Sequence, residues 1–119
     1  MGGPQSAYDP ANKYPSKEFE INAIKEFTKS GKHVLGFCLG SQLIATAFGG
    51  KAYANIVNGK KFKETGFYKI QLTKTGKKDK IFKNFPKEFD VFQWHGDVFD
   101  IPKNAEFLAT ANPVKKQAF

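Results

Sequence analysis

The strongest chemical signal in the sequence is a single cysteine between two glycines, in the run Gly36-Phe37-Cys38-Leu39-Gly40. Gly-x-Cys-x-Gly is the thiol form of the nucleophile elbow, in which a reactive side chain sits on a sharp turn between a strand and a helix. Glycines at 36 and 40 leave room for such a turn. The positive end of the following helix would favour a thiolate, and the N–H of Leu39 would face a developing oxyanion.

A free cysteine is more often a small buried apolar residue, so the flanking sequence has to decide between the two interpretations. The nearly all-apolar run 33–37 predicts a strand buried on both faces, as in a parallel sheet. A short helix over about Leu39–Phe48 should follow and end at Gly49-Gly50. Strand, turn and helix are the context that the motif requires, which favours a nucleophile.

The rest of the chain predicts an α/β layered fold. Ser16 should cap a helix that Gly31 ends. Its buried face would carry Phe19, Ala23, Ile24 and Phe27. Residues 51–65 predict strand fragments and turns around Asn58-Gly59, and residues 74–85 predict a solvated turn followed by one helical turn. Further strands are expected at Tyr68–Leu72, Phe89–Trp94 and Glu106–Thr110, with a loop at His95–Asp97.

Several separate segments, in order along almost the whole chain, resemble the class I (triad-type) glutamine amidotransferase family. The similar segments are Gly2–Ser6 with Tyr8-Asp9, Gly31–Gln42, Lys63–Tyr68, Val91–Asp97 and Gln117–Phe119. Within the family they are similar to stand-alone domains like the glutaminase half of GMP synthetase. The resemblance implies a flavodoxin-like three-layer α/β/α sandwich with a mostly parallel central sheet. It also implies that no metal or organic cofactor is needed.

The resemblance implies a reaction and a set of site residues. Cys38 would attack the side-chain amide of glutamine, giving glutamate and ammonia for an accepting synthetase domain or subunit. The backbone of Leu39 and of Gly3, or of Gly2 if the register slips, would form the oxyanion hole. The substrate-binding residues would be Gln42, Trp94, His95, Gly96 and Asp97.

The sequence departs from the family at the catalytic base. The family has a His followed two residues later by Glu near the C-terminus, and the only histidines here are His33 and His95. His33 stands where the family usually has Pro, and we expect no catalytic role for it. His95 is expected in the pocket wall, with a catalytic His95–Asp97 pair as the alternative. Because triad members act as a unit, we expect this chain to be nearly inactive, as a central fragment incomplete at both ends.

Composition narrows the remaining alternatives. The formal net charge is +8, but all the basic residues are spread-out lysines, which favours a solvated surface over nucleic-acid binding. One cysteine permits no internal disulfide and indicates a reducing, cytoplasmic setting. There is no signal peptide pattern and no apolar run of the roughly 18 residues that a membrane span needs. A non-catalytic binding relative and a γ-glutamyl thiol peptidase stay open as alternatives.

Overall fold

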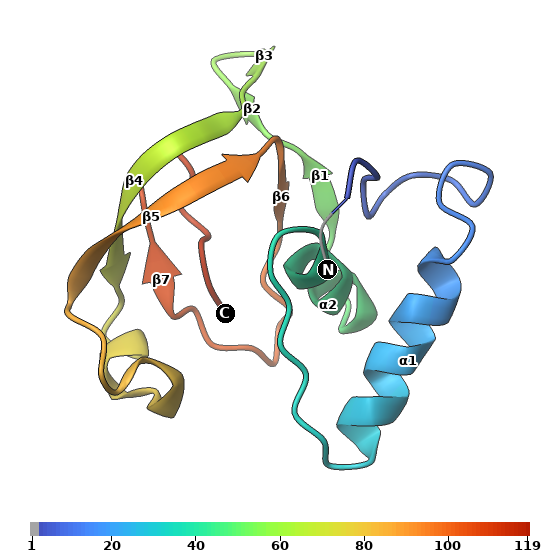
Figure 1. Cartoon of the computed structure of the whole chain (residues 1–119), viewed down its shortest axis with the longest axis horizontal. Helices are drawn as coiled ribbons and strands as arrows, with labels where there is room; N and C mark the ends of the chain where they lie inside the picture. Colours follow the sequence, from blue (N-terminus) through green and yellow to red (C-terminus); the bar gives the residue numbers. More distant parts are fainter. Residues whose placement is uncertain (1–2) are drawn as a thin grey trace.

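The computed structural model, which describes residues 3–119, places two helices beside a set of short sheets (Figure 1). The helices are α1 (Lys17–Lys29) and α2 (Leu39–Ala47). The strands are β1 (Ala52–Ala54), β2 (Ile56–Val57), β3 (Lys60–Lys61), β4 (Glu64–Leu72), β5 (Glu88–His95), β6 (Asp97–Phe99) and β7 (Ala109–Thr110). Two 3₁₀ turns, η1 (Gly76–Lys78) and η2 (Lys80–Phe82), join β4 to β5. Mixed helix and strand confirms the α/β class.

Helix α1 starts and ends where the sequence predicts, but its N-terminus lacks the expected side-chain cap. Gly31 has φ +78°, and the N–H groups of Gly31 and Lys32 donate to the carbonyls of Thr28 and Phe27, which closes the helix in a Schellman motif. Ser16 occupies the N-cap position, but its hydroxyl donates to the Glu20 carboxylate instead of accepting from the backbone. The expected side-chain cap is therefore replaced by a side-chain pair within the first turn.

The helices form one small core with the N-terminal loop. Its buried members are Ala7, Tyr14, Ile21, Ile24, Leu39, Leu43 and Ala47. The predicted apolar face of α1 is thus partly wrong, because Phe19 and Phe27 are exposed and Ile21 joins Ile24 in the contact with α2. Burial and the hydrogen bond to Glu20 raise the pKa of Tyr14 to about 12, and this contact fastens the N-terminal loop to α1.

The second core lies under a three-stranded sheet in the order β5-β4-β7. Strands β4 and β5 pair antiparallel, from Glu64 opposite His95 to Gln71 opposite Glu88. Strand β4 therefore begins four residues before the predicted Tyr68. Every strand pair in residues 3–119 runs antiparallel, so the predicted parallel sheet is not found in this part of the chain.

The run 33–37, predicted to be a strand buried on both faces, is extended but pairs with no strand of residues 3–119. Leu35 is 66% exposed and Phe37 is 70% exposed. A strand becomes buried on both faces only when strands lie on its two edges and helices cover the sheet. The described residues supply helix α2 next to it, but no neighbouring strand.

The remaining elements follow local signals. Asn58 and Gly59 both have positive φ, 51° and 75°, which turns β2 into β3 as a two-residue hairpin. Helix α2 ends at Gly49, φ +89°, as predicted. The strand expected over Glu106–Thr110 is reduced to its last two residues. No helix among residues 3–119 is both long and apolar enough to cross a bilayer.

Candidate active site

Cys38 lies at the N-cap of helix α2 in a backbone conformation that is unusual for a residue with a side chain. Its φ is 51° and its ψ is −119°, and its side chain is exposed. Non-glycine residues at positive φ are uncommon and are concentrated at functional sites, where the surrounding structure holds the strain. The thiol is therefore presented at the surface by a sharp turn that leads directly into a helix.

The glycine two residues earlier allows the turn to approach the helix. A Cβ placed on Gly36 would lie 2.5 Å from the carbonyl carbon of Gly40 and 2.6 Å from Cδ1 of Ile44. Real Cβ atoms do not come so close to backbone atoms, so any side chain at 36 would push the turn away from α2. This contact agrees with the expectation from the sequence that Gly36 leaves room for the turn.

A cavity of about 570 Å³ opens beside the thiol. Several sequence-predicted site residues line it together, namely Gly3, Cys38, Leu39, Gln42, Trp94, His95, Gly96 and Asp97, joined by Pro4, Gln5 and Lys63. Gly2 lies outside the described residues. The N-terminal loop at Gly3 therefore faces the cysteine turn across one cavity, as an oxyanion hole built from the two backbones would require.

Two polar groups at this cavity have no partner within residues 3–119. The N–H of Leu39, at the first position of α2, donates to no acceptor there. The side chain of Gln42 is buried, and its Oε1 accepts no hydrogen bond. Buried polar atoms without a partner are costly, so a ligand that supplies a donor to Gln42 would relieve this cost.

The segment 94–97 forms the opposite wall. Strand β5 runs to His95, Gly96 makes the turn, and β6 starts at Asp97, so the expected three-residue loop is shortened to one residue. The Asp97 carboxylate accepts from the hydroxyls of Ser6, 2.6 Å, and Tyr8, 3.2 Å. These bonds hold the N-terminal loop against the turn.

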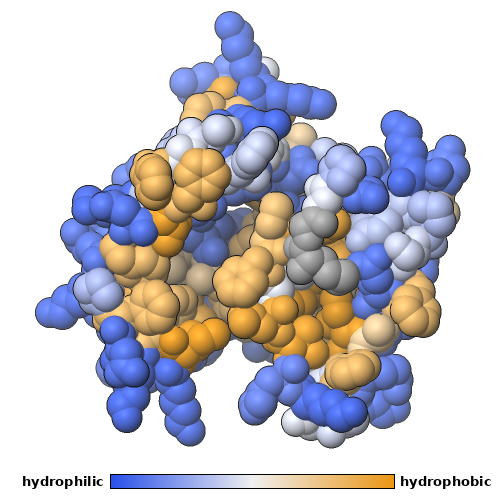
Figure 2. Space-filling model, viewed as in Figure 1, coloured by the Kyte–Doolittle hydropathy of each residue, from blue (hydrophilic) through white to orange (hydrophobic). Residues whose placement is uncertain are grey.

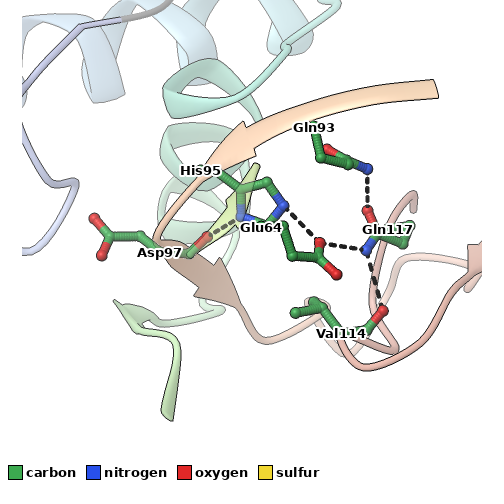
Figure 3. A network of polar contacts seen from close by, with 6 residues as sticks. All are labelled: Glu64, Gln93, His95, Asp97, Val114 and Gln117. Atoms are coloured by element: carbon green, nitrogen blue, oxygen red, sulfur yellow. Dashed lines mark hydrogen bonds and ion pairs between the residues drawn. The ribbon is translucent and has the colours of Figure 1, made fainter. Parts of the chain in front are cut away.

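His95 is paired with a carboxylate that the sequence did not single out. Its Nε2 lies 3.0 Å from Oε2 of Glu64, and its Nδ1 lies 2.9 Å from the backbone oxygen of Asp97 (Figure 3). The His95–Asp97 pair considered from the sequence is therefore wrong in its partner, because the Asp97 side chain is turned to Ser6 and Tyr8. The antiparallel register of β4 and β5, which sequence reasoning did not predict, brings Glu64 opposite His95.

A second cavity has a volume of about 360 Å³. It shares Cys38, Gln42, His95 and Asp97 with the first, and its remaining lining is mostly apolar, from residues 36–37 and the inner face of the sheet. Figure 2 shows apolar residues gathered on either side of a hollow in the middle of this face. His33 lines neither cavity.

Comparison with known proteins identifies the family of this chain. The family profile "Glutamine amidotransferase class-I" matches residues 1–118. A glutamine amidotransferase-like protein of Salmonella typhimurium is 31% identical over 119 residues, covering 98% of this chain and 48% of that protein. One subunit of the glutamine-hydrolysing GMP synthase of Methanococcus aeolicus is 33% identical over 105 residues, covering 87% of this chain and 52% of that protein.

A solved structure shows the same likeness in three dimensions. The crystal structure of a glutamine amidotransferase from Thermotoga maritima superposes with a TM-score of 0.85 and 37% identity, covering 98% of this chain and 47% of that one. The chain thus spans about half the length of these relatives. The profile covers nearly every residue, and the chain therefore belongs to the class I glutamine amidotransferase family.

Proposed function

We propose that this chain is the central part of a class I glutamine amidotransferase domain, and that glutamine binds in the cavity beside Cys38. The observation that carries the proposal is the position of the thiol. It is exposed at a strained turn, at the start of a helix, in one cavity with Gly3, Gln42 and His95. Relatives named as glutamine amidotransferases and as glutamine-hydrolysing GMP synthases support glutamine as the substrate.

The chemistry proceeds in two stages. The Cys38 thiolate attacks the side-chain carboxamide carbon, and the carbonyl electron pair moves to oxygen. The N–H groups of Leu39 and Gly3 stabilise this oxyanion, and such a donor contributes about 3–4 kcal/mol to the transition state. The protonated nitrogen leaves as ammonia, and a thioester remains. Water then hydrolyses the thioester, which releases glutamate and regenerates the thiol.

Residues 3–119 offer no histidine for the proton transfers. His95 has both ring nitrogens engaged, and His33 lies away from the cavity. We propose that the base comes from a part of the family domain that residues 3–119 do not include, since these residues match only about half the length of the relatives. In the same completed domain, the extended run 33–37 would become a strand of a parallel sheet with helices on both faces. Ammonia would pass to an accepting synthetase domain or subunit, in a reducing cytoplasm that keeps the thiol free.

Titration of ¹⁵N-labelled chain with glutamine tests the binding site. The backbone amide signals of Leu39, Gln42 and Gly96 should shift together and saturate, with an affinity in the range of about 1 μM to 1 mM that is usual for enzyme substrates. The signal of Gly59, in the distant hairpin, serves as the internal control. Shifts confined to remote residues would contradict the proposal.

Three further ligands separate the alternatives. Asparagine, shorter by one methylene, and glutamate, which lacks the amide, should bind more weakly than glutamine. A γ-glutamyl dipeptide that binds more tightly than glutamine would favour a thiol peptidase. Glutamate release by the 119-residue chain should stay near background, because the base is missing. Turnover at ordinary enzyme rates would refute the fragment interpretation.

A further inference from the structure

Glu64 is a buried carboxylate at the edge of the candidate site. Its side chain is 0% exposed, and it lies opposite His95 where β4 begins and β5 ends. A carboxylate removed from water is costly unless it is paired and hydrogen-bonded. The cost indicates that this residue is held in place for the contact it makes.

The contacts of His95 fix how many protons the pair holds. The Asp97 backbone oxygen can only accept, so Nδ1 of His95 must carry a proton. A neutral ring would then present a lone pair from Nε2 to a carboxylate oxygen 3.0 Å away. Two acceptors at this distance repel each other, so the contact requires one additional proton between Nε2 and Oε2.

The C-terminal segment contacts the same oxygen of the Glu64 carboxylate that faces His95, whereas Oε1 has no partner within residues 3–119. Nε2 of Gln117 donates to Oε2 of Glu64, 3.1 Å, and to the backbone oxygen of Val114, 3.1 Å. Nε2 of Gln93 donates to Oε1 of Gln117, 2.7 Å, which fixes the orientation of that amide (Figure 3). Glu64 therefore accepts from two different segments through one oxygen.

The chain of contacts continues into the glutamine cavity. His95 is tied through Nδ1 to the backbone of Asp97, and the Asp97 carboxylate holds Ser6 and Tyr8 of the N-terminal loop. That loop carries Gly3, which lines the cavity with Cys38. One buried carboxylate thus supports the wall opposite the thiol and the loop beside it.

We propose that Glu64 is a positioning residue, which holds His95 and one shared proton so that the Gly96 turn and the N-terminal loop close the glutamine cavity around Cys38. The part concerning glutamine rests on the proposed function, and the proton count at His95 does not. Glutamine at position 64 cannot replace the carboxylate. In Glu64→Gln, the atom that donates to Nε2 of His95 would have to be the amide nitrogen. That nitrogen cannot also accept from Gln117, as Oε2 of Glu64 does.

The proton count is tested by long-range ¹H–¹⁵N spectra of the imidazole rings in the whole chain. The wild type should show two slowly exchanging protons at His95, one on Nδ1 and one in the contact with Glu64. In Glu64→Gln only the Nδ1 proton should remain. The exposed ring of His33 should show neither in either protein. A single ring proton in the wild type, or an unchanged pair in the variant, would overturn the proposal.

Glu88→Gln is the matched control. Glu88 lies at the other end of the same two strands, where it accepts from Gln71 across the pair, 2.9 Å, in an exposed position. Glu88→Gln should leave both His95 protons and the affinity for glutamine unchanged. Glu64→Gln should weaken glutamine binding in the titration about tenfold. Equal affinities in Glu64→Gln and the wild type would contradict the positioning role.

A second variant covers the case in which Glu64→Gln does not fold. Gln117→Ala removes one donor and leaves the Glu64–His95 contact in place. It should keep both His95 protons while the shared proton exchanges with water several-fold faster. Exchange at the wild-type rate would contradict the proposed support from Gln117. If the wild type itself does not bind glutamine, the proposed function is wrong. The number of His95 ring protons still tests the Glu64 contact in that case.

Discussion

At the scale of single residues, the site depends on the backbone of Cys38 and on the absence of a side chain at Gly36. Positive φ at Cys38 turns the thiol outward, and the Gly40 backbone packs where a Cβ at position 36 would lie. Strain of this kind costs on the order of 1–3 kcal/mol and persists only where neighbouring structure enforces it. The close contact of Gly36 with α2 is one such enforcement.

Gly36→Ala should therefore damage both stability and the reactive turn. Forcing an extra carbon into this contact should lower the free energy of unfolding by about 1–3 kcal/mol, and it should change the rate at which iodoacetamide modifies Cys38. Gly31→Ala is the control, because the cost at Gly31 comes from its φ of +78° alone, with no atom within 4 Å of an added Cβ. That variant should lose about 1 kcal/mol and keep the wild-type labelling rate. Urea unfolding and labelling kinetics measure the two effects, and a wild-type labelling rate in Gly36→Ala would contradict the proposed role of this glycine.

The sequence predicted the cysteine turn and missed its supporting carboxylate for a physical reason. The Gly-x-Cys-x-Gly pattern is local, and it specifies a turn through the sterics of adjacent residues. Glu64 lies in the polar segment 51–65, predicted as strand fragments and turns, where a charged residue normally indicates solvent. Only the strand register places it against His95. Its presence in one of the segments that resemble the family was the single sequence signal that could have drawn attention to it.

At the scale of elements, helix ends and tight turns were predicted well, and strand partners were not. Gly31 and Asn58-Gly59 act through their own backbone preferences, so their effects can be read locally. The run 33–37 has the composition of a buried strand, but burial depends on neighbours that the run itself cannot specify. Leu35 consequently remains exposed in this chain.

This difference predicts how the chain responds to two leucine substitutions. Leu35→Ala should change the free energy of unfolding by less than about 0.5 kcal/mol, because the side chain already contacts water. Leu43→Ala should cost about 2–5 kcal/mol, because Leu43 is 0% exposed in the core between the helices. Urea unfolding of both variants measures the contrast. Equal losses would mean that residues 33–37 are buried in the folded chain.

At the scale of the whole molecule, charge contacts join the C-terminal segment to the paired strands β1 and β6. The Asp100 carboxylate accepts from the Lys116 ammonium and from the Tyr53 hydroxyl, 3.0 Å. The hydrogen bond from Lys116 is the largest cause that holds the pKa of Asp100 below its ordinary value of 3.8. The same hydrogen bond raises the pKa of Lys116 above 10.5. These partners are partly exposed, so the contact contributes modestly to stability.

The sign of the pH dependence follows from the lowered pKa of Asp100. Its contribution is fully present above pH 3.8, the ordinary value, and is lost as the pH falls through the lower folded-state pKa. Lys116→Met should reduce stability at pH 7 and flatten the loss of stability below pH 3.8. Lys115→Met, one residue earlier, removes only a contact with Asn112 and should leave the acid limb unchanged. Urea midpoints across this range test both variants, and identical acid limbs in Lys116→Met and wild type would contradict the assignment.

The central claim is that the cavity recognises glutamine and that Cys38 reacts with the ligand bound there. A glutamine analogue with a diazoketone in place of the carboxamide should alkylate the thiol, losing nitrogen as the carbon–sulfur bond forms. Mass spectrometry of the tryptic peptide 33–51 should locate the label on Cys38. We predict saturable labelling that free glutamine suppresses and asparagine does not. Labelling at the rate of a simple diazoketone, unaffected by glutamine, would contradict the claim.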